Sequence, residues 1–151
     1  MKRRDALRNS AAVLGMLMAA GLLPQAAQAA YNKTAFDAKT VADVLKAMGA
    51  AAPAESKDVT LTAPDIAENG AVVPLGAATS LPNVKQMLVL VEKNPNTLVA
   101  AFTVNEALEA NFLTRAKLGQ SSDVYAVAIT NDGKAFYAKK EVKVTLGGCG
   151  G

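Results

Sequence analysis

Residues 84–104, VKQMLVLVEKNPNTLVAAFTV, decide the fold of this chain. The first part, 84–93, is apolar at consecutive positions near its centre, which predicts a central strand that is buried on both faces. The polar stretch EKNPNT at 92–97 has the composition of a tight turn. The last part alternates in character and predicts a second strand with four apolar side chains on one face: Leu98, Ala100, Phe102 and Val104.

Further strands are predicted on both sides of this pair, separated by turn residues such as Asn69-Gly70 and Asn131-Asp132-Gly133. With them the chain has about seven short strands at regular spacing, the pattern of an all-β antiparallel sandwich. Strands do not alternate with helices, so a Rossmann-type nucleotide site is not expected. Pro74 predicts an edge strand or a bulge. The remaining predicted strands lie at 58–63, 68–77, 111–118, 122–130 and 134–146.

One helix is predicted before the strands, within residues 36–49. Val41, Val44, Leu45 and Met48 recur at helical spacing. Asp37 is the expected N-cap, Phe36 is expected to pack against Val41, and Gly49 is expected to end the helix. The helix is interpreted as packing against one edge of the core.

Residues 1–29 have the layout of a cleaved export signal. A charged start is followed by the 13-residue apolar run AAVLGMLMAAGLL, which is shorter than the roughly 20 residues that span a membrane. A small-residue cleavage site lies near Ala29. The adjacent pair Arg3-Arg4 favours the twin-arginine route, although Lys2 and Ala6 depart from its usual pattern. The mature β-sandwich domain is therefore expected to span residues 30–146 and to lie outside the cytoplasm.

Charge and composition exclude several kinds of function. Without residues 1–29, which hold four of the 16 basic and one of the 13 acidic residues, the net charge is zero. A nucleic-acid-binding function therefore loses its support. The chain has no histidine and a single cysteine, so nucleophile pairs that need histidine and His/Cys zinc sites are impossible within it. No metal site, no cofactor and no contact with a membrane are predicted.

The only cysteine lies near the end of the chain, directly after the last predicted strand. Val142, Val144 and Leu146 alternate with polar residues and anchor that strand up to Leu146. Glycine loses the most entropy on ordering, so residues 147–151 are expected to form a flexible arm that carries a thiol about 10 Å from Leu146. A thiolate is a strong nucleophile and holds sulfur in several oxidation states. The arm consists of Gly147, Gly148, Cys149, Gly150 and Gly151.

This tail, preceded by VKVTL, resembles SoxY, the sulfur-carrier subunit of the thiosulfate-oxidising Sox system. Four further stretches also resemble that family: DIAENGAVVPL, VEKNPNTLVAAF, TRAKLGQSSDVYAVA and DGKAFYAKKEVKVT. Thr97 departs from the family, whose members often carry proline after NPN.

The resemblance implies an immunoglobulin-like sandwich in the periplasm that pairs with a second β-sandwich subunit, SoxZ. It implies that Cys149 carries sulfur intermediates derived from thiosulfate, and that the chain is not itself an enzyme. A haem enzyme would attach thiosulfate to Cys149, a hydrolase would release sulfate, and a dehydrogenase would oxidise the remaining sulfur. From the residues alone, the two-sided apolar stretch MLVLV predicts an uncovered sheet face that is buried against a second β-rich subunit.

Three alternatives remain open on the residues alone. The chain could be a secreted binding module whose Cys149 forms an interchain disulfide. It could be a passive sandwich that binds through its loops. It could be a ubiquitin-like carrier that reacts through the carboxylate of Gly151, although an export signal argues against a reaction that needs cytoplasmic ATP.

Overall fold

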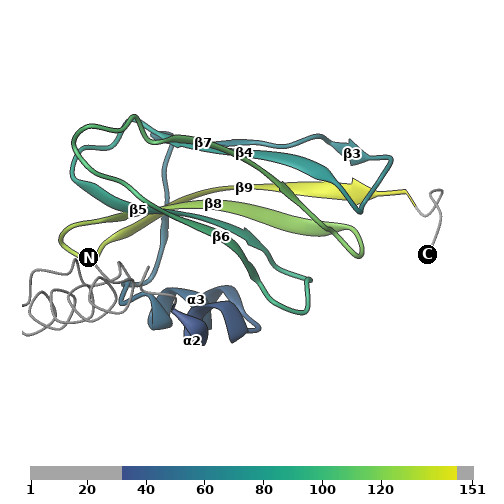
Figure 1. Ribbon diagram of the computed structural model, residues 1–151, viewed down its shortest axis with the longest axis horizontal. Helices are drawn as coiled ribbons and strands as arrows, with labels where there is room; N and C mark the ends of the chain where they lie inside the picture. Colours follow the sequence, from purple (N-terminus) through teal and green to yellow (C-terminus); the bar gives the residue numbers. More distant parts are fainter. Residues whose placement is uncertain (1–31, 146–151) are drawn as a thin grey trace, which may run out of the picture. The chain divides into compact units, whose positions relative to one another are not determined.

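The computed structural model describes residues 32–145, which fold as two β-sheets and a pair of short helices (Figure 1). The larger sheet has the strand order β1-β9-β8-β5-β6, with β3 also pairing with β9. The smaller sheet has the order β2-β4-β7. The strands are β1 (Ala54–Glu55), β2 (Val59–Thr62), β3 (Ile66–Ala67), β4 (Val73–Thr79), β5 (Val84–Val91), β6 (Leu98–Thr103), β7 (Asn111–Ala116), β8 (Ser122–Thr130) and β9 (Ala135–Val144).

The prediction of a β-sandwich is confirmed, and its long strands all pair antiparallel. The two-residue strands β1 and β3 were not predicted, and both pair parallel with β9. Two residues are too few to show an alternating pattern, so the sequence gives no sign of them. The immunoglobulin-like connectivity stays a prediction.

The core has two parts, one on each face of the larger sheet. Met87, Val89 and Val91 of β5 pack toward the smaller sheet. Leu88 and Leu90 pack with the helices on the other face (Figure 1). The prediction that β5 is a central strand is therefore confirmed. The expectation that its apolar centre leaves a sheet face uncovered is wrong, because the helices and the smaller sheet bury residues 87–91 completely.

Two helices, α2 (Lys33–Asp37) and α3 (Val41–Ala47), stand in place of the single predicted helix. Asp37 is the last residue of α2 and not an N-cap, and Phe36 lies inside α2. Thr40 causes the break: its backbone is extended and its side chain accepts a hydrogen bond from the N–H of Asp43, so it caps α3.

The predicted end of the helix at Gly49 is confirmed. Gly49 has a φ of +69°, and its N–H bonds the carbonyl of Lys46 while the N–H of Ala50 bonds that of Leu45. These two bonds form a Schellman motif, in which glycine adopts the left-handed conformation without strain.

Two predictions about β4 and β6 need correction. Pro74 does not lie on an edge strand, because β4 runs between β2 and β7. The proline is tolerated since the β2 pairing ends at Gly76, so Pro74 has a ladder partner only on the β7 side. In β6, Leu98 packs on the helix side and not with Ala100 and Phe102. The pairing with β5 skips Val99, and such a bulge reverses the alternation of side chains.

Thr97 is fully buried, and its hydroxyl has no hydrogen-bond partner among the described residues. Its backbone N–H donates to the carbonyl of Ala38 at 3.2 Å, a bond that proline could not make. We expect Thr97→Val, which keeps the shape but removes the hydroxyl, to raise the free energy of unfolding by about 1 kcal/mol. Urea denaturation measures this, with the exposed Thr103→Val as the matched control that should shift it by less than about 0.5 kcal/mol. A destabilised Thr97→Val would show that a water or a relaxed neighbour satisfies the hydroxyl.

Among the helices of residues 32–145, none has the length and apolar character required to cross a membrane.

Candidate functional site

The predicted site residues lie outside the part of the chain that the structure describes. This applies to Cys149 and the flanking Gly147, Gly148, Gly150 and Gly151, to Leu146, and to Arg3, Arg4 and Ala29 of the predicted signal. The structure does describe the strand that leads to the thiol. β9 is followed through Thr145, four residues before Cys149.

The end of β9 is held on both sides. β3 lies parallel to it and pairs Ile66 with Lys143 and Ala67 with Val144. The N–H of Lys143 donates to the carbonyl of Asp65 at 3.0 Å, and that of Thr145 donates to the carbonyl of Ala67 at 3.2 Å. From the other side, the N–H of Val144 donates to Ser121 Oγ at 2.9 Å. The backbone is thus fixed up to the last described residue.

A close contact between two loops stands beside this strand end. The N–H of Leu118 donates to the carbonyl of Gly70 at 2.7 Å. A Cβ on Gly70 would lie 2.5 Å from the carbonyl oxygen of Leu118 and 2.8 Å from a methyl carbon of Val144. Only glycine lets these backbones approach so closely without displacing Val144.

Asn94 brings a third loop to the same place. Its side-chain nitrogen donates to the carbonyl of Lys117 at 2.7 Å, and the N–H of neighbouring Lys93 donates to Ser122 Oγ at 3.0 Å. We call the three segments 65–72, 93–94 and 117–122 the exit collar, because they are linked to one another and to the end of β9. All three lie toward the end of the sandwich at which β9 finishes (Figure 1).

The exit collar explains three of the stretches that carried the family resemblance. Gly70 lies in DIAENGAVVPL, Asn94 in VEKNPNTLVAAF and Ser121 in TRAKLGQSSDVYAVA. Sequence reasoning gave these residues no role beyond turns, because no pattern within one segment shows that three distant loops meet. Their presence together in the quoted stretches was the available signal.

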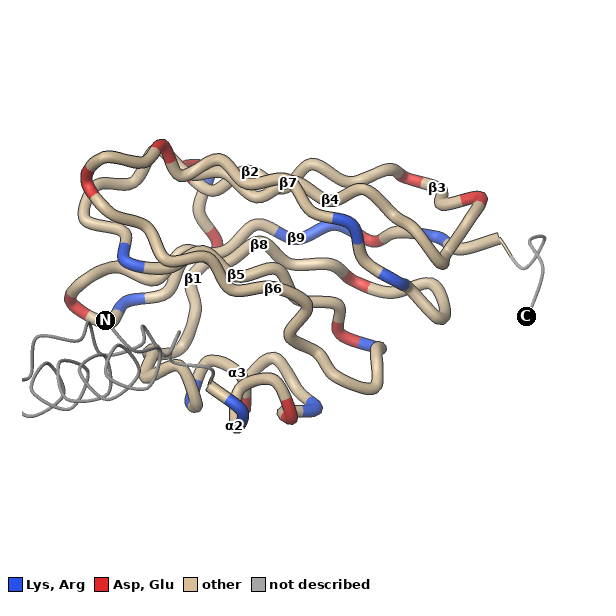
Figure 2. The backbone as a smooth tube through the Cα atoms, in the orientation of Figure 1, with Lys and Arg blue, Asp and Glu red and all other residues tan. Residues whose placement is uncertain are grey.

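Charges along β9 are largely paired (Figure 2). Lys140 Nζ lies 2.8 Å from Asp65 Oδ1 and also donates to the carbonyl of Ala63 at 2.8 Å. The hydrogen bond and the charge of Lys140 lower the pKa of the Asp65 carboxyl. Lys139 pairs with Asp123 at 3.5 Å and lies 5.9 Å from the centre of the Tyr125 ring. These lysines therefore hold β9 to its neighbours.

No group of three or more acidic or cysteine side chains within residues 32–145 is arranged to hold a metal ion.

Comparison with protein families gives a match to the model of the sulfur oxidation protein SoxY over residues 44–149. The match runs from α3 through the sandwich and ends at Cys149. The chain belongs to the SoxY family. Among solved structures, this SoxY-family chain is similar to the sulfur carrier protein SoxY from Chlorobium limicola f thiosulfatophilum, with 33% identity and a TM-score of 0.57. That alignment covers 62% of this chain and 84% of the other.

A second solved structure shares only the fold with this SoxY-family chain. The superoxide reductase (neelaredoxin) from Ignicoccus hospitalis is 18% identical, with a TM-score of 0.51 and a coverage of 58% of this chain and 80% of the other. No curated protein matched this chain significantly.

Proposed function

We propose that the chain is a periplasmic sulfur carrier that holds sulfur intermediates derived from thiosulfate on Cys149. The observation that carries this proposal is the SoxY family match that ends at this cysteine. The geometry supports it. β9 is fixed through Thr145 by the exit collar, so a tail that starts there has a defined origin. The predicted export signal, residues 1–29, supports the location.

In the proposed cycle the chain supplies the thiol, and partner enzymes supply the chemistry. A haem enzyme joins the Cys149 sulfur to the terminal sulfur of thiosulfate; the thiol proton leaves, and the haem enzyme accepts a pair of electrons. A hydrolase then adds water across the bond to the sulfonate, which releases sulfate and leaves a persulfide on Cys149. A dehydrogenase oxidises the outer sulfur to a sulfonate with oxygen from water, or that sulfur is passed on. Hydrolysis of the sulfonate regenerates the thiol. The chain needs no cofactor of its own in this cycle.

Mass spectrometry of the exported protein separates this proposal from its alternatives. A carrier shows sulfur adducts on Cys149 after incubation with thiosulfate and the partner enzymes. An interchain disulfide gives a reducible dimer instead. A ubiquitin-like carrier shows a modified carboxylate at Gly151. An unmodified chain under all conditions would leave only the passive binding module.

The glycines of the arm can be tested by a double substitution. We expect Gly147→Val/Gly148→Val to abolish most thiosulfate oxidation, because β-branched residues stiffen the backbone and add bulk where the tail must enter a partner enzyme. The alkylation rate of Cys149 and the melting temperature should hardly change. The experiment compares all three quantities with wild type and with the conservative Gly147→Ala/Gly148→Ala. Oxidation at the normal rate would show that these glycines are dispensable, and a parallel loss of alkylation would place the defect in the thiol.

The second proposed element is a partner subunit of the SoxZ type, a β-sandwich that forms a heterodimer or larger complex with this chain. Membership of the SoxY family supports it. The haem enzyme, the hydrolase and the dehydrogenase are proposed to bind only transiently, while each acts on Cys149.

A further inference from the structure

The outer face of the smaller sheet is the sheet face that other described elements leave open. Register places Thr62, Gly76 and Leu113 in one row across β2, β4 and β7, and Pro74 and Arg115 in the next. The opposite side of the same strands, including Val73 and Leu75, is buried in the sandwich core. We call the side that carries these two rows the outer face.

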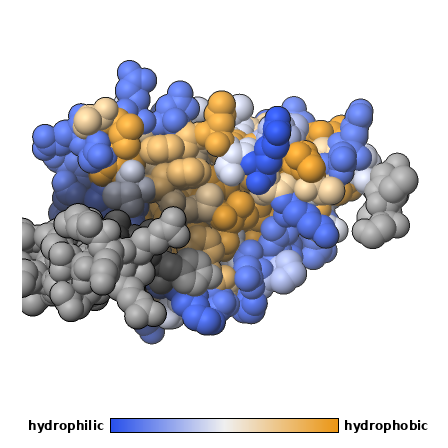
Figure 3. All heavy atoms as spheres, viewed as in Figure 1, coloured by the Kyte–Doolittle hydropathy of each residue, from blue (hydrophilic) through white to orange (hydrophobic). Residues whose placement is uncertain are grey.

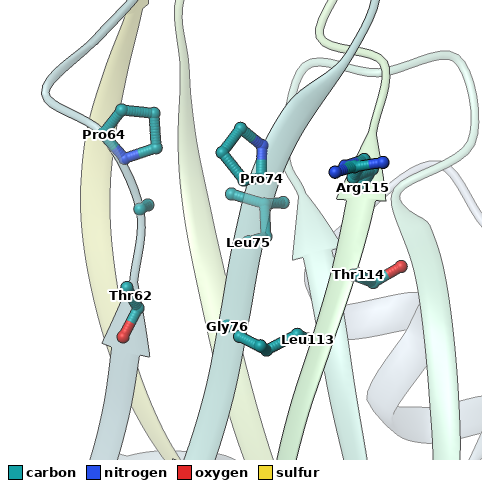
Figure 4. A pocket seen from close by; sticks show the side chains of 9 residues that line it. Thr62, Pro64, Pro74, Leu75, Gly76, Leu113, Thr114 and Arg115 are labelled. Atoms are coloured by element: carbon teal, nitrogen blue, oxygen red, sulfur yellow. The ribbon is translucent and has the colours of Figure 1, made fainter.

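The outer face is apolar and uneven. Leu113 is 81% exposed, the largest exposed fraction among the large hydrophobic side chains of the described residues. It leans over Gly76, where a Cβ would lie 3.0 Å from its Cδ2 (Figure 4). Next to it lies a groove of about 790 Å³, bordered by Thr62, Pro64, Pro74 and Arg115. Figure 3, seen from the side, shows hydrophobic residues gathered in the middle of the molecule with hydrophilic residues around them.

Arg115 provides the one charge on these rows. It is the only arginine outside the predicted signal, and no ion pair to it is formed within residues 32–145. A guanidinium beside apolar surface favours a carboxylate that can bond it in the bidentate fashion. Apolar surface with an isolated arginine is also the composition of protein interfaces, which are enriched in arginine and depleted in lysine and acidic residues.

We propose that the outer face is where the second subunit docks, and that this subunit presents an apolar sheet face with a carboxylate opposite Arg115. Burial of Leu113 and pairing of Arg115 are the expected sources of affinity. The inference rests on the proposed function only for the identity of that subunit. Ala63 and Pro64 connect β2 to β3, so the docked subunit would lie beside the exit collar.

The test uses the mature chain and the SoxZ-type subunit of the same organism, with affinity measured by isothermal titration calorimetry. Leu113→Glu places a charge in the contact and should weaken binding at least 100-fold. Leu108→Glu is the matched control, because Leu108 is also exposed, at 51%, but lies in the loop between β6 and β7. It should bind within about threefold of wild type. Arg115→Glu should weaken binding at least tenfold, and Arg115→Lys should weaken it less.

The outcomes separate the surface from the proposed function. Tight binding by Leu113→Glu would overturn the docking surface and leave the carrier function standing. If wild type binds no SoxZ-type subunit but forms a dimer that Leu113→Glu dissociates, a second copy occupies the face and the inference is wrong. If a tail lacking 147–151 changes the hydrogen exchange of Leu113 and Arg115 in the free chain, the tail is the occupant and the inference is likewise wrong. Failure of the carrier function would appear separately, as an absence of adducts on Cys149.

Discussion

Replacing Cys149 by serine is expected to abolish sulfate formation from thiosulfate. Cys149 is the only cysteine, so no other thiol in the chain can accept the substrate. A serine hydroxyl cannot form a disulfide-like bond to the outer sulfur of thiosulfate, and so the first covalent step has no acceptor. The loss should be complete within detection, whereas stability should stay within about 0.5 kcal/mol of wild type, since the core in residues 32–145 does not include this position.

The measurement is sulfate production by the reconstituted partner enzymes, together with thermal denaturation of each variant. Thr145→Ser is the control, because it keeps a hydroxyl and lies at the last described position of the strand end. It should retain most of the activity. Normal turnover by Cys149→Ser would contradict the carrier proposal, and a large loss of stability would mean that the cysteine has a structural role.

The predicted long strands are confirmed because their signal is local. Residues 122–130 alternate and turn residues bound them, so their limits could be read from the sequence as β8 (Ser122–Thr130). The apolar centre of β5 also gave the right location, but the wrong reason for a partner surface. Periodicity shows that both faces of a strand are buried, yet it does not show whether the cover comes from the same chain. Here α3 provides it, with Val44 and Leu45 in the helix-side core.

The features that were missed depend on contacts between distant segments. The bulge at Val99 exists only relative to β5, and it turned Leu98 to the other face. The docking surface was also hidden, because Leu113 and Gly76 become neighbours only through the pairing of β4 with β7. The break between α2 and α3 is the exception. Thr40 followed by Asp43 is a capping pattern that was visible in the sequence, although the apolar stripe across it favoured one continuous helix.

Gly70→Ala is expected to cause the largest loss of stability among single changes in the exit collar. The new Cβ would lie 2.5 Å from a backbone oxygen of Leu118, and that atom cannot move away as a flexible side chain could. Either the 2.7 Å hydrogen bond between Leu118 and Gly70 breaks or the loop shifts, and Val144 must move in both cases. Overpacking of this kind costs about 3 kcal/mol, which is a large part of the stability of a small domain.

Gly119→Ala is the matched control, one residue beyond Leu118 in the same loop. A Cβ there meets nothing within 4 Å, so the free energy of unfolding should stay the same or rise by up to about 1 kcal/mol. Urea denaturation gives both values, and hydrogen exchange at Val144 and Thr145 reports whether the end of β9 has loosened. If the collar fixes the root of the carrier tail, Gly70→Ala should speed exchange at these two amides and slow sulfur transfer, while Cys149 still reacts with a small alkylating reagent at the normal rate. Equal stability of the two variants would show that the loops part without cost, and the exit collar would then have no role in holding the strand.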